Sequence, residues 1–230
     1  MTKTSILQSV SILLLSTTGL MLSGCQQNTP IILCENLITE DYNDRGQANC
    51  ALKINDGSGI MLGVHYGEPA DGDEYADVNV DIQVLTANGK VKQTITETSG
   101  YVFGMPKIKD LDVDGRNEVL VPLMTGNANT VYAVWRSHSN SQKYMRAGEI
   151  SAFNFEPAEN GLFQTSARAS AVSWATSYYK FIDGNITEIA TAMTQLPDSE
   201  DGVETCTLSD DGGLALIGLT LAQAQDKFCG

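Results

Sequence analysis

Apolar and polar residues alternate along the middle of the chain with a period of two. Valine or isoleucine stands at every second position from Val78 to Val84, with polar residues between them. This is the pattern of a strand that buries one face. The segment Thr86 to Lys90 contains Asn88-Gly89, a pair that favours the positive φ angles of a tight hairpin turn. Lys90 to Thr96 is then expected to return as the partner strand.

The same signals recur downstream and predict an all-β fold. Further strands are expected at Ile60–Tyr66, Met105–Ile108, Glu118–Met124, Thr130–Arg136, Ala152–Phe155, Tyr178–Ile182 and Ile186–Ala190. Asp183-Gly184-Asn185 is a second tight turn. Short strands separated by such turns predict an antiparallel β-sandwich or an incomplete, propeller-like sheet. One short C-terminal helix is expected from Leu221 to Phe228, because Thr220 and Gln223 have the spacing of a capping box.

The first 24 residues have the organisation of a bacterial export signal. Lys3 precedes a mostly apolar stretch, Ile6 to Leu22, which is too short and too interrupted for a spanning helix. Leu22-Ser23-Gly24-Cys25 resembles a lipobox, in which small residues precede an obligatory cysteine. We expect cleavage after Gly24 and lipidation of Cys25, including palmitate-type acyl chains. The alternative is a secreted protein with a free cysteine near its cleavage site.

A lipidated Cys25 would hold the chain at a membrane through its anchor alone. Each buried methylene adds about 0.8 kcal/mol, so two or three acyl chains give an effectively permanent anchor. Residues 25–33 would form a tether, and residues 34–230 a single β-rich periplasmic domain. Gln26, where some lipoproteins have Asp, favours the periplasmic side of the outer membrane, with the inner membrane and the cell surface as alternatives.

Four further cysteines remain after Cys25. An even number in an exported domain indicates disulfides. Three pairings are available, and we expect the two local ones, which would fasten each end of the chain to the domain: Cys34–Cys50 and Cys206–Cys229. No CxxC spacing suggests a zinc or redox site.

The chain is strongly acidic, with 28 Asp and Glu against 14 Lys and Arg and a formal net charge of −14. Binding to nucleic acid needs basic side chains on the phosphates, so this charge argues against it. The charge suits a basic protein partner, whose encounter it would accelerate. Solubility alone is the alternative explanation.

Carboxylates gather between two predicted strands, from Asp110 to Glu118. Calcium takes six to eight oxygen ligands in irregular geometry, which such a cluster can supply. An EF-hand is excluded, because Val121 stands where that loop has its closing Glu and because strands flank the segment. The segment resembles the Asp-x-Asp-x-Asp-Gly-x-x-Glu loop of FG-GAP-like β-proteins. We therefore expect a structural Ca²⁺, the alternative being a solvated acidic turn, with these ligands: the side chains of Asp110, Asp112, Asp114 and Glu118 and the carbonyl of Arg116.

The sequence does not mark out a catalytic site. The two histidines, His65 and His138, lie far apart, and no Ser–His–Asp or Cys–His arrangement is apparent. No carboxylate pair stands out for glycoside hydrolysis either. We therefore expect a protein that is not an enzyme.

From Lys107 to Ala190 the sequence resembles bacterial periplasmic lipoproteins related to the I-type lysozyme inhibitors. One branch of that family protects bacteria from their own secreted peptidoglycan hydrolases. The order and spacing of the shared features carry the resemblance: the Asp110–Glu118 loop, Asn129-Thr130-Val131-Tyr132-Ala133-Val134-Trp135, Ser141-Gln142-Lys143-Tyr144, Gly148-Glu149-Ile150-Ser151, Phe155-Glu156-Pro157, Ser166–Trp174, Tyr178-Tyr179-Lys180-Phe181 and Asp183-Gly184.

The resemblance implies that a protruding loop plugs the cleft of a peptidoglycan hydrolase. The corresponding loop is Ser166 to Thr176, although relatives tend to have Ser-Gly followed by Tyr where this chain has Ser170-Ala171 and then Ser173-Trp174. Ser99-Gly100-Tyr101 is a second candidate. The contact residues expected are Ser166, Arg168, Ser170, Ser173 and Trp174, or Ser99 and Tyr101. The function implied is inhibition of a basic peptidoglycan hydrolase or lysozyme-like effector. The alternative is a calcium-stabilised structural or adhesive envelope lipoprotein without an enzyme target.

Overall fold

The computed structural model describes residues 32–36, 49–55, 59–69, 73, 76–100, 105–138, 143–197 and 203–230. Residues Ile31–Gly230 form one compact unit. The expected signal peptide, the lipidation site Cys25 and most of the tether lie outside the described residues. Within the described ranges, no helix has the length and apolar character needed to cross a membrane.

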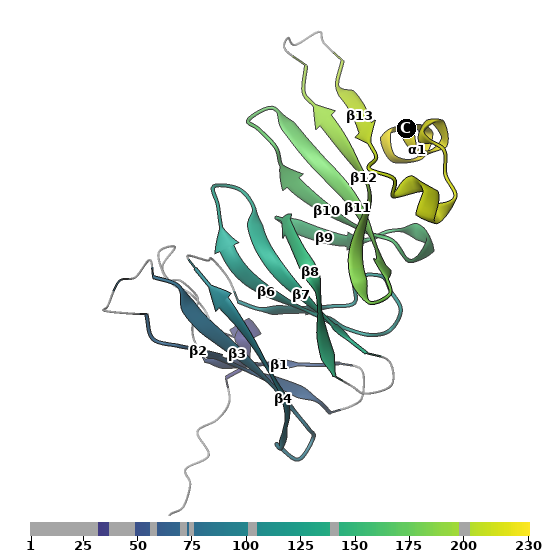
Figure 1. The fold of residues 1–230 in the computed structure, drawn as a ribbon. Helices are drawn as coiled ribbons and strands as arrows, with labels where there is room; N and C mark the ends of the chain where they lie inside the picture. The colour runs from purple at the N-terminus through teal and green to yellow at the C-terminus, as the bar shows by residue number, and fades with distance from the viewer. Residues whose placement is uncertain are drawn as a thin grey trace, which may run out of the picture. The chain divides into compact units, whose positions relative to one another are not determined.

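The described strands form three antiparallel sheets that follow one another along the chain (Figure 1). The first sheet contains β1 (Cys50–Lys53), β2 (Met61–Tyr66), β3 (Val78–Leu85) and β4 (Val91–Ser99). The second contains β5 (Lys107–Lys109), β6 (Glu118–Thr125), β7 (Thr130–Ser137) and β8 (Tyr144–Ala152). The third contains β9 (Asn154–Pro157), β10 (Phe163–Arg168), β11 (Ser173–Ile182), β12 (Asn185–Gln195) and β13 (Thr205–Ser209). The predicted all-β, sandwich-like fold is confirmed.

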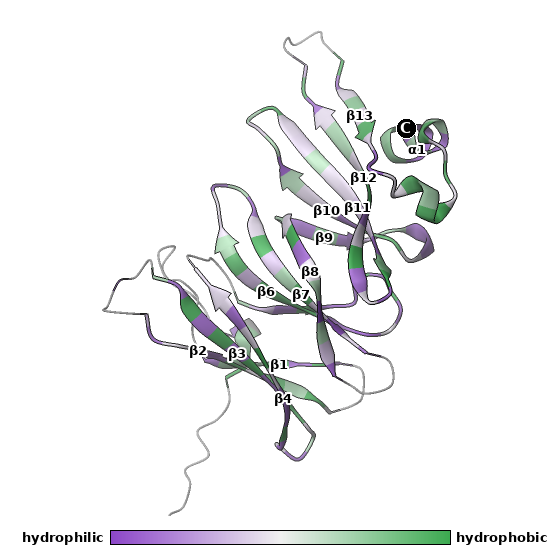
Figure 2. Cartoon of the chain, viewed as in Figure 1, coloured by the Kyte–Doolittle hydropathy of each residue, from purple (hydrophilic) through white to green (hydrophobic). Residues whose placement is uncertain are grey.

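The central strands of the second sheet, β6 and β7, carry buried residues on both faces. Val119 and Val121 of β6 pack with the first sheet in one apolar cluster, whereas Leu120 between them packs with the third sheet in another. Because successive side chains of a strand point to opposite faces, β6 needs apolar residues at consecutive positions. The first five residues of β6 are indeed all buried, and the first of them is Glu118. In β3, by contrast, buried residues alternate with more exposed ones, as predicted, and the hydropathy of the strands follows these differences (Figure 2).

The two predicted tight turns differ in backbone geometry. At Asp183-Gly184 both residues have positive φ, 50° and 83°, as a two-residue hairpin turn requires. In the turn before β4, Gly89 has φ 78° but Asn88 is not among the residues with positive φ. The prediction that Asn88-Gly89 supplies two such angles is therefore wrong. The turn instead contains three residues between Thr86 and Lys90. It is closed by a 2.9 Å hydrogen bond from the Thr86 N–H to the Lys90 carbonyl.

Several strands were not predicted, because their apolar alternation is weak. They are β1, β8, β10, β13, the first half of β11 and the second half of β12. Serine, threonine and alanine prevail in β10 and the first half of β11, and such residues give little apolar alternation. The side chains of β11 are all only partly buried. The segment Ala152–Phe155, predicted as one strand, is divided at Phe153 between β8 and β9.

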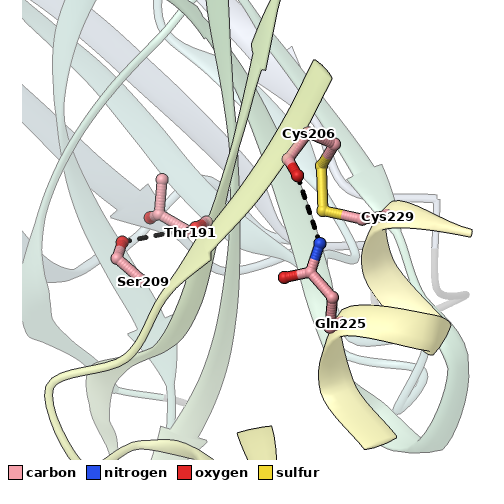
Figure 3. Close-up of a disulfide and its surroundings, with 5 residues drawn as sticks. All are labelled: Thr191, Cys206, Ser209, Gln225 and Cys229. Atoms are coloured by element: carbon pink, nitrogen blue, oxygen red, sulfur yellow. Dashed lines mark hydrogen bonds between the residues drawn. A yellow bond between two sulfur atoms is a disulfide. The ribbon is translucent and has the colours of Figure 1, made fainter. Parts of the chain in front are cut away.

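Both predicted disulfides are present. Cys34 in η1 (Cys34–Asn36) is bonded to Cys50 at the start of β1, and Cys206 in β13 is bonded to Cys229 at the end of α1 (Figure 3). The helix α1 (Leu221–Cys229) has the predicted capping box between Thr220 and Gln223. Together with the short 3-10 helix η4 (Leu214–Ile217), it covers a third apolar cluster around Ile189 and Ala190. Ala158 and Leu162, which flank the 3-10 helix η3 (Glu159–Gly161), also belong to this cluster.

We expect the Cys206–Cys229 bond to stabilise the C-terminal cover of the third sheet. Its two cysteines are separated by 23 residues, and closing a loop of this size restricts the unfolded chain by about 3 kcal/mol. Replacing both cysteines with serine should lower the free energy of unfolding in urea by about that amount. The wild-type protein measured without reductant provides the comparison, and an unchanged urea midpoint in the double variant would contradict the expectation.

Candidate functional site

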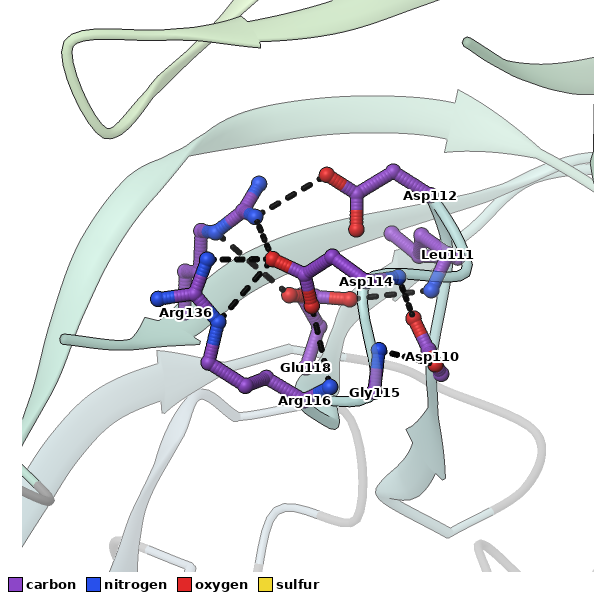
Figure 4. A network of polar contacts seen from close by, with 8 residues as sticks. All are labelled: Asp110, Leu111, Asp112, Asp114, Gly115, Arg116, Glu118 and Arg136. Atoms are coloured by element: carbon purple, nitrogen blue, oxygen red, sulfur yellow. Dashed lines mark hydrogen bonds and ion pairs between the residues drawn. The ribbon is translucent and has the colours of Figure 1, made fainter. Parts of the chain in front are cut away.

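The acidic loop, residues 110–118, connects β5 to β6 (Figure 4). Hydrogen bonds between a side chain of the loop and its own backbone fix its conformation. The carboxylate of Asp110 accepts hydrogen bonds from the N–H groups of Asp114, at 3.1 Å, and Gly115, at 2.9 Å. Val113 has φ 58° and Gly115 has φ 85°. A positive φ is unfavourable for a β-branched residue such as Val113. The turn is therefore held in a conformation that its sequence alone would disfavour.

Glu118 lies fully buried at the start of β6. One carboxylate oxygen, Oε2, accepts a 2.9 Å hydrogen bond from the Leu111 N–H. The other, Oε1, is buried without a hydrogen-bond partner, as is Oδ1 of Asp112. Burial raises the pKa of the Glu118 carboxyl to about 8, because the charged form loses its hydration. The second sheet thus contains a carboxylate that needs a cation nearby to be ionised at neutral pH.

Arg136, at the end of β7, supplies positive charge to this loop. Its Nη2 lies 2.9 Å from Asp112 Oδ2 and 2.5 Å from Asp114 Oδ2. Its Nε lies 3.7 Å from Glu118 Oε1, and its guanidinium stacks 3.9 Å from the centre of the Phe181 ring. The sequence analysis did not single out Arg136. Its position on the same side of β7 as the buried Tyr132 and Val134 was an available signal, since a charge at such a position requires partners.

The predicted calcium ligands divide into two groups. Asp110, Asp112 and Glu118 each place a carboxylate oxygen within 4.8 Å of the others, so together they could hold a metal ion. Asp114 is engaged differently, because Arg116 and Arg136 both bind its Oδ2. Burial alone would raise the pKa of Asp114, but hydrogen bonds from Arg116 and the charge of Arg136 hold it below its ordinary value.

The predicted contact loop is shorter than expected. Ser166 pairs with Thr176, and Arg168 with Trp174, across the β10–β11 ladder, so only residues 169–172 form the tip of the hairpin. The prediction of a loop from Ser166 to Thr176 is wrong, because the backbone pairing continues through its hydroxyl-rich flanks. Ser166, Arg168, Ser173 and Trp174 belong to strands, and Ser170 lies in the tip.

Hydrogen bonds hold this tip in one conformation. The Arg168 guanidinium donates to the carbonyls of Ser170, at 2.9 Å, and Ala171, at 3.0 Å. The hydroxyls of Ser170 and Ser173 lie 2.7 Å apart. The Arg168 backbone is also tied to the side chain of Asn129, in the β6–β7 turn, by two further hydrogen bonds. The tip is exposed but internally ordered.

The apolar group at the tip is Val172 and not Trp174. Trp174 is half-buried in β11, with the Arg168 guanidinium 5.9 Å from its ring centre. Val172 is 46% exposed, and its carbonyl accepts a hydrogen bond from the N–H of Leu196, which is 38% exposed. Trp174, one of the expected contact residues, is therefore part of the β10–β11 ladder and does not lie at the tip.

In the second candidate loop, Ser99-Gly100-Tyr101, one of the two expected contact residues is buried. Ser99 is fully buried, and its hydroxyl donates a 3.0 Å hydrogen bond to the Pro122 carbonyl. It joins the first sheet to the second and is not available to a partner, so its prediction as a contact residue is wrong. Tyr101 lies outside the described residues.

No protein-family model and no curated protein matches this chain. A solved structure described as "Structure of a Xanthomonas Type IV Secretion System related protein" is similar to it, with a TM-score of 0.50 and 12% sequence identity. The similarity covers 75% of this chain and 93% of that chain. At this identity the likeness concerns the fold alone.

We expect Arg136 to contribute far more to stability than Arg116, although both bind Asp114. The Arg136 side chain is only 12% exposed and faces a fully buried Glu118, whereas that of Arg116 is 38% exposed. Removing one partner from a buried ion pair costs about 3 kcal/mol or more, and removing an exposed one costs less than about 1 kcal/mol. Urea unfolding of Arg136→Met and Arg116→Met, with a chelator present, should show this difference. Equal losses would contradict it.

Proposed function

We propose that this chain is a lipid-anchored periplasmic protein that binds and inhibits a peptidoglycan-degrading enzyme through the tip of the β10–β11 hairpin. The ordered, exposed tip is the observation that carries the proposal. Binding is costly when a loop must first be ordered, and the hydrogen bonds made by Arg168 and Ser170 remove much of that cost in advance. Small residues at the tip let its backbone approach closely, and the serine hydroxyls can donate to the carboxylates of a glycosidase cleft.

Exposed apolar side chains beside the tip fit a binding surface. Val172 and Leu196 are joined by a backbone hydrogen bond. The N–H of Phe153, which is 49% exposed, donates to the Ser166 carbonyl on the neighbouring strand. Apolar groups near the centre of an interface contribute most of its binding energy. The net charge of −14 would favour encounter with a basic enzyme.

The sequence features and the structural neighbour point in the same direction. The resemblance from Lys107 to Ala190 is to lipoproteins related to lysozyme inhibitors, and the export signal with Cys25 would place the domain beside the cell wall. The similar solved structure is described as related to a type IV secretion system. A protein that guards against secreted hydrolases would be consistent with that association.

We propose further that the acidic loop binds a structural Ca²⁺ through Asp110, Asp112 and Glu118. Ligand oxygens about 2.4 Å from one calcium ion lie at most about 5 Å apart, and the oxygens of this trio lie within 4.8 Å. Two of its members, Asp112 and Glu118, each have a buried carboxylate oxygen without a hydrogen bond. A cation there would compensate the carboxylates that Arg136 reaches only in part, and would brace the turn that leads into β6.

Calcium should stabilise the protein, and the effect should depend on the trio. At a free calcium concentration of about 100 times Kd, binding adds about 2.7 kcal/mol, which raises the melting temperature by several degrees. Asp112→Asn and Glu118→Gln should abolish this rise. Asp211→Asn is a matched control, because Asp211 is an exposed acid remote in sequence from the loop. A rise of equal size in Asp112→Asn and the wild type would contradict the proposed ligands.

Replacing Val172 with Asp should weaken inhibition of a hydrolase about tenfold or more, because a charge would be buried at the centre of the contact. The enzymes to test are an invertebrate-type lysozyme and a peptidoglycan hydrolase encoded beside this gene. Inhibition is measured by the clearing of a peptidoglycan suspension. Val91→Asp is the control, since Val91 is 45% exposed against 46% for Val172 but begins β4 in the first sheet.

Equal inhibition by Val172→Asp and the wild type would remove the hairpin tip from the interface. If the wild type inhibits neither enzyme but calcium still stabilises it, the alternative of a structural or adhesive envelope lipoprotein is favoured instead.

A further inference from the structure

A cavity of about 550 Å³ lies beside the acidic loop. Its walls come from the acidic loop, the end of β7, the start of β8 and the hairpin between β11 and β12. Arg116, Arg136 and Arg146 line it, together with His138. The whole chain has only five arginines, so three of them meet at this one place.

The polarity of this cavity is opposite to that of the whole protein. The chain has twice as many acidic as basic residues, 28 against 14. Among the described residues, Asp183 is nevertheless the single acid that lines the cavity. The carboxylates that neutralise the arginines do not line it, and they hold the guanidinium groups in place from other positions. Arg146 is bound in this way by Glu97, at 2.7 Å, and by Glu149, at 2.5 Å.

The arginines retain donor groups for a ligand. Arg116 and Arg146 form their ion pairs through Nε and Nη2, and no described residue accepts a hydrogen bond from their Nη1 atoms. Nη1 of Arg136 is buried without a partner. A guanidinium fork that is already fixed loses little entropy when it binds a carboxylate or a phosphate, and its geometry matches both groups.

The cavity also has an apolar side. Phe181 and Met145 line it, and the Phe181 ring is covered by Arg136. An oxyanionic group could therefore be bound by the arginines while a small apolar part of the same ligand contacts these two side chains.

We propose that this cavity is a binding site for an oxyanionic group, a carboxylate or a phosphate. The group comes either from a free small anion or from a larger ligand with an apolar part beside the charge. The proposal does not rest on the inhibitor function, since the cavity and the hairpin tip have no residue in common.

Calorimetric titration of the purified protein at low ionic strength tests the site with defined probes. Inorganic phosphate represents the free anion, and N-acetylphenylalanine represents a carboxylate with an apolar part. N-acetylphenylalaninamide is the uncharged control. We expect saturable binding of at least one anion and none of the amide; binding of the second anion only would indicate a larger ligand. Absence of binding by both anions, or equal binding of the acid and its amide, would overturn the proposal.

Two variants assign the binding to the cavity. Arg146→Gln should weaken it about tenfold or more by removing charge-assisted hydrogen bonds. Asn185→Asp should weaken it as well, by placing a carboxylate in the lining while every ion pair of the arginines stays in place. The second variant keeps the test decisive if the first is poorly folded.

The matched control is Asn127→Asp, because it adds the same charge in the exposed turn between β6 and β7, at the other end of β7 from Arg136. Binding should be unchanged in this control. Equal loss in Asn127→Asp and Asn185→Asp would show a general effect of net charge, and no loss in either Arg146→Gln or Asn185→Asp would place the anion elsewhere; both results overturn the site.

Discussion

The burial of β6 on both faces is the constraint on which the rest of this structure depends. Val119 and Val121 contact the first sheet's core and Leu120 contacts the third sheet's core, so the strand that follows the acidic loop has no solvated side over its first five residues. Glu118, as the first residue of that strand, is carried into the interior with it. A buried carboxylate is expensive unless it is protonated or paired, and this cost determines how the neighbouring charges are arranged.

Arg136 offsets part of the cost of burying the Glu118 carboxylate. It reaches three carboxylates of the acidic loop and stacks on Phe181 of the third sheet. The same guanidinium also lines the arginine-rich cavity. The proposed cation site and the proposed anion site therefore share Arg116 and Arg136 as neighbours. A cation bound by Asp112 and Glu118 would compete with Arg136 for these two carboxylates, and would leave the donors of Arg136 freer for an anion.

The tip of the β10–β11 hairpin is ordered although it is not buried. Arg168, Ser170 and Asn129 fix its backbone through hydrogen bonds. An exposed segment gains little stability from such bonds, because water could replace them. Their benefit is greater in binding, where a fixed loop avoids the entropy cost of ordering. This contrast is the physical basis of the proposal that the tip binds a partner.

The sequence by itself determined the features that depend on local pairing or spacing. The alternation from Val78 to Val84 set a strand with one buried face, and Thr220 with Gln223 set the start of the helix. Cysteines close in sequence set both disulfides. The alternate carboxylates of the acidic loop identified a cluster of acids, because the spacing of short side chains along a turn already brings their oxygens together.

Only the tertiary structure decided which of those acids the arginines bind and which surfaces are exposed. Asp114 is taken by arginines, one of which lies 22 residues away on another strand. Ser99 is buried by the second sheet. Trp174 is drawn into a ladder whose polar sequence gives no strong strand signal. In each case the deciding partner is distant along the chain. A pattern of neighbouring residues describes the faces of one strand, but it does not contain the identity of the sheet or charge that packs against them.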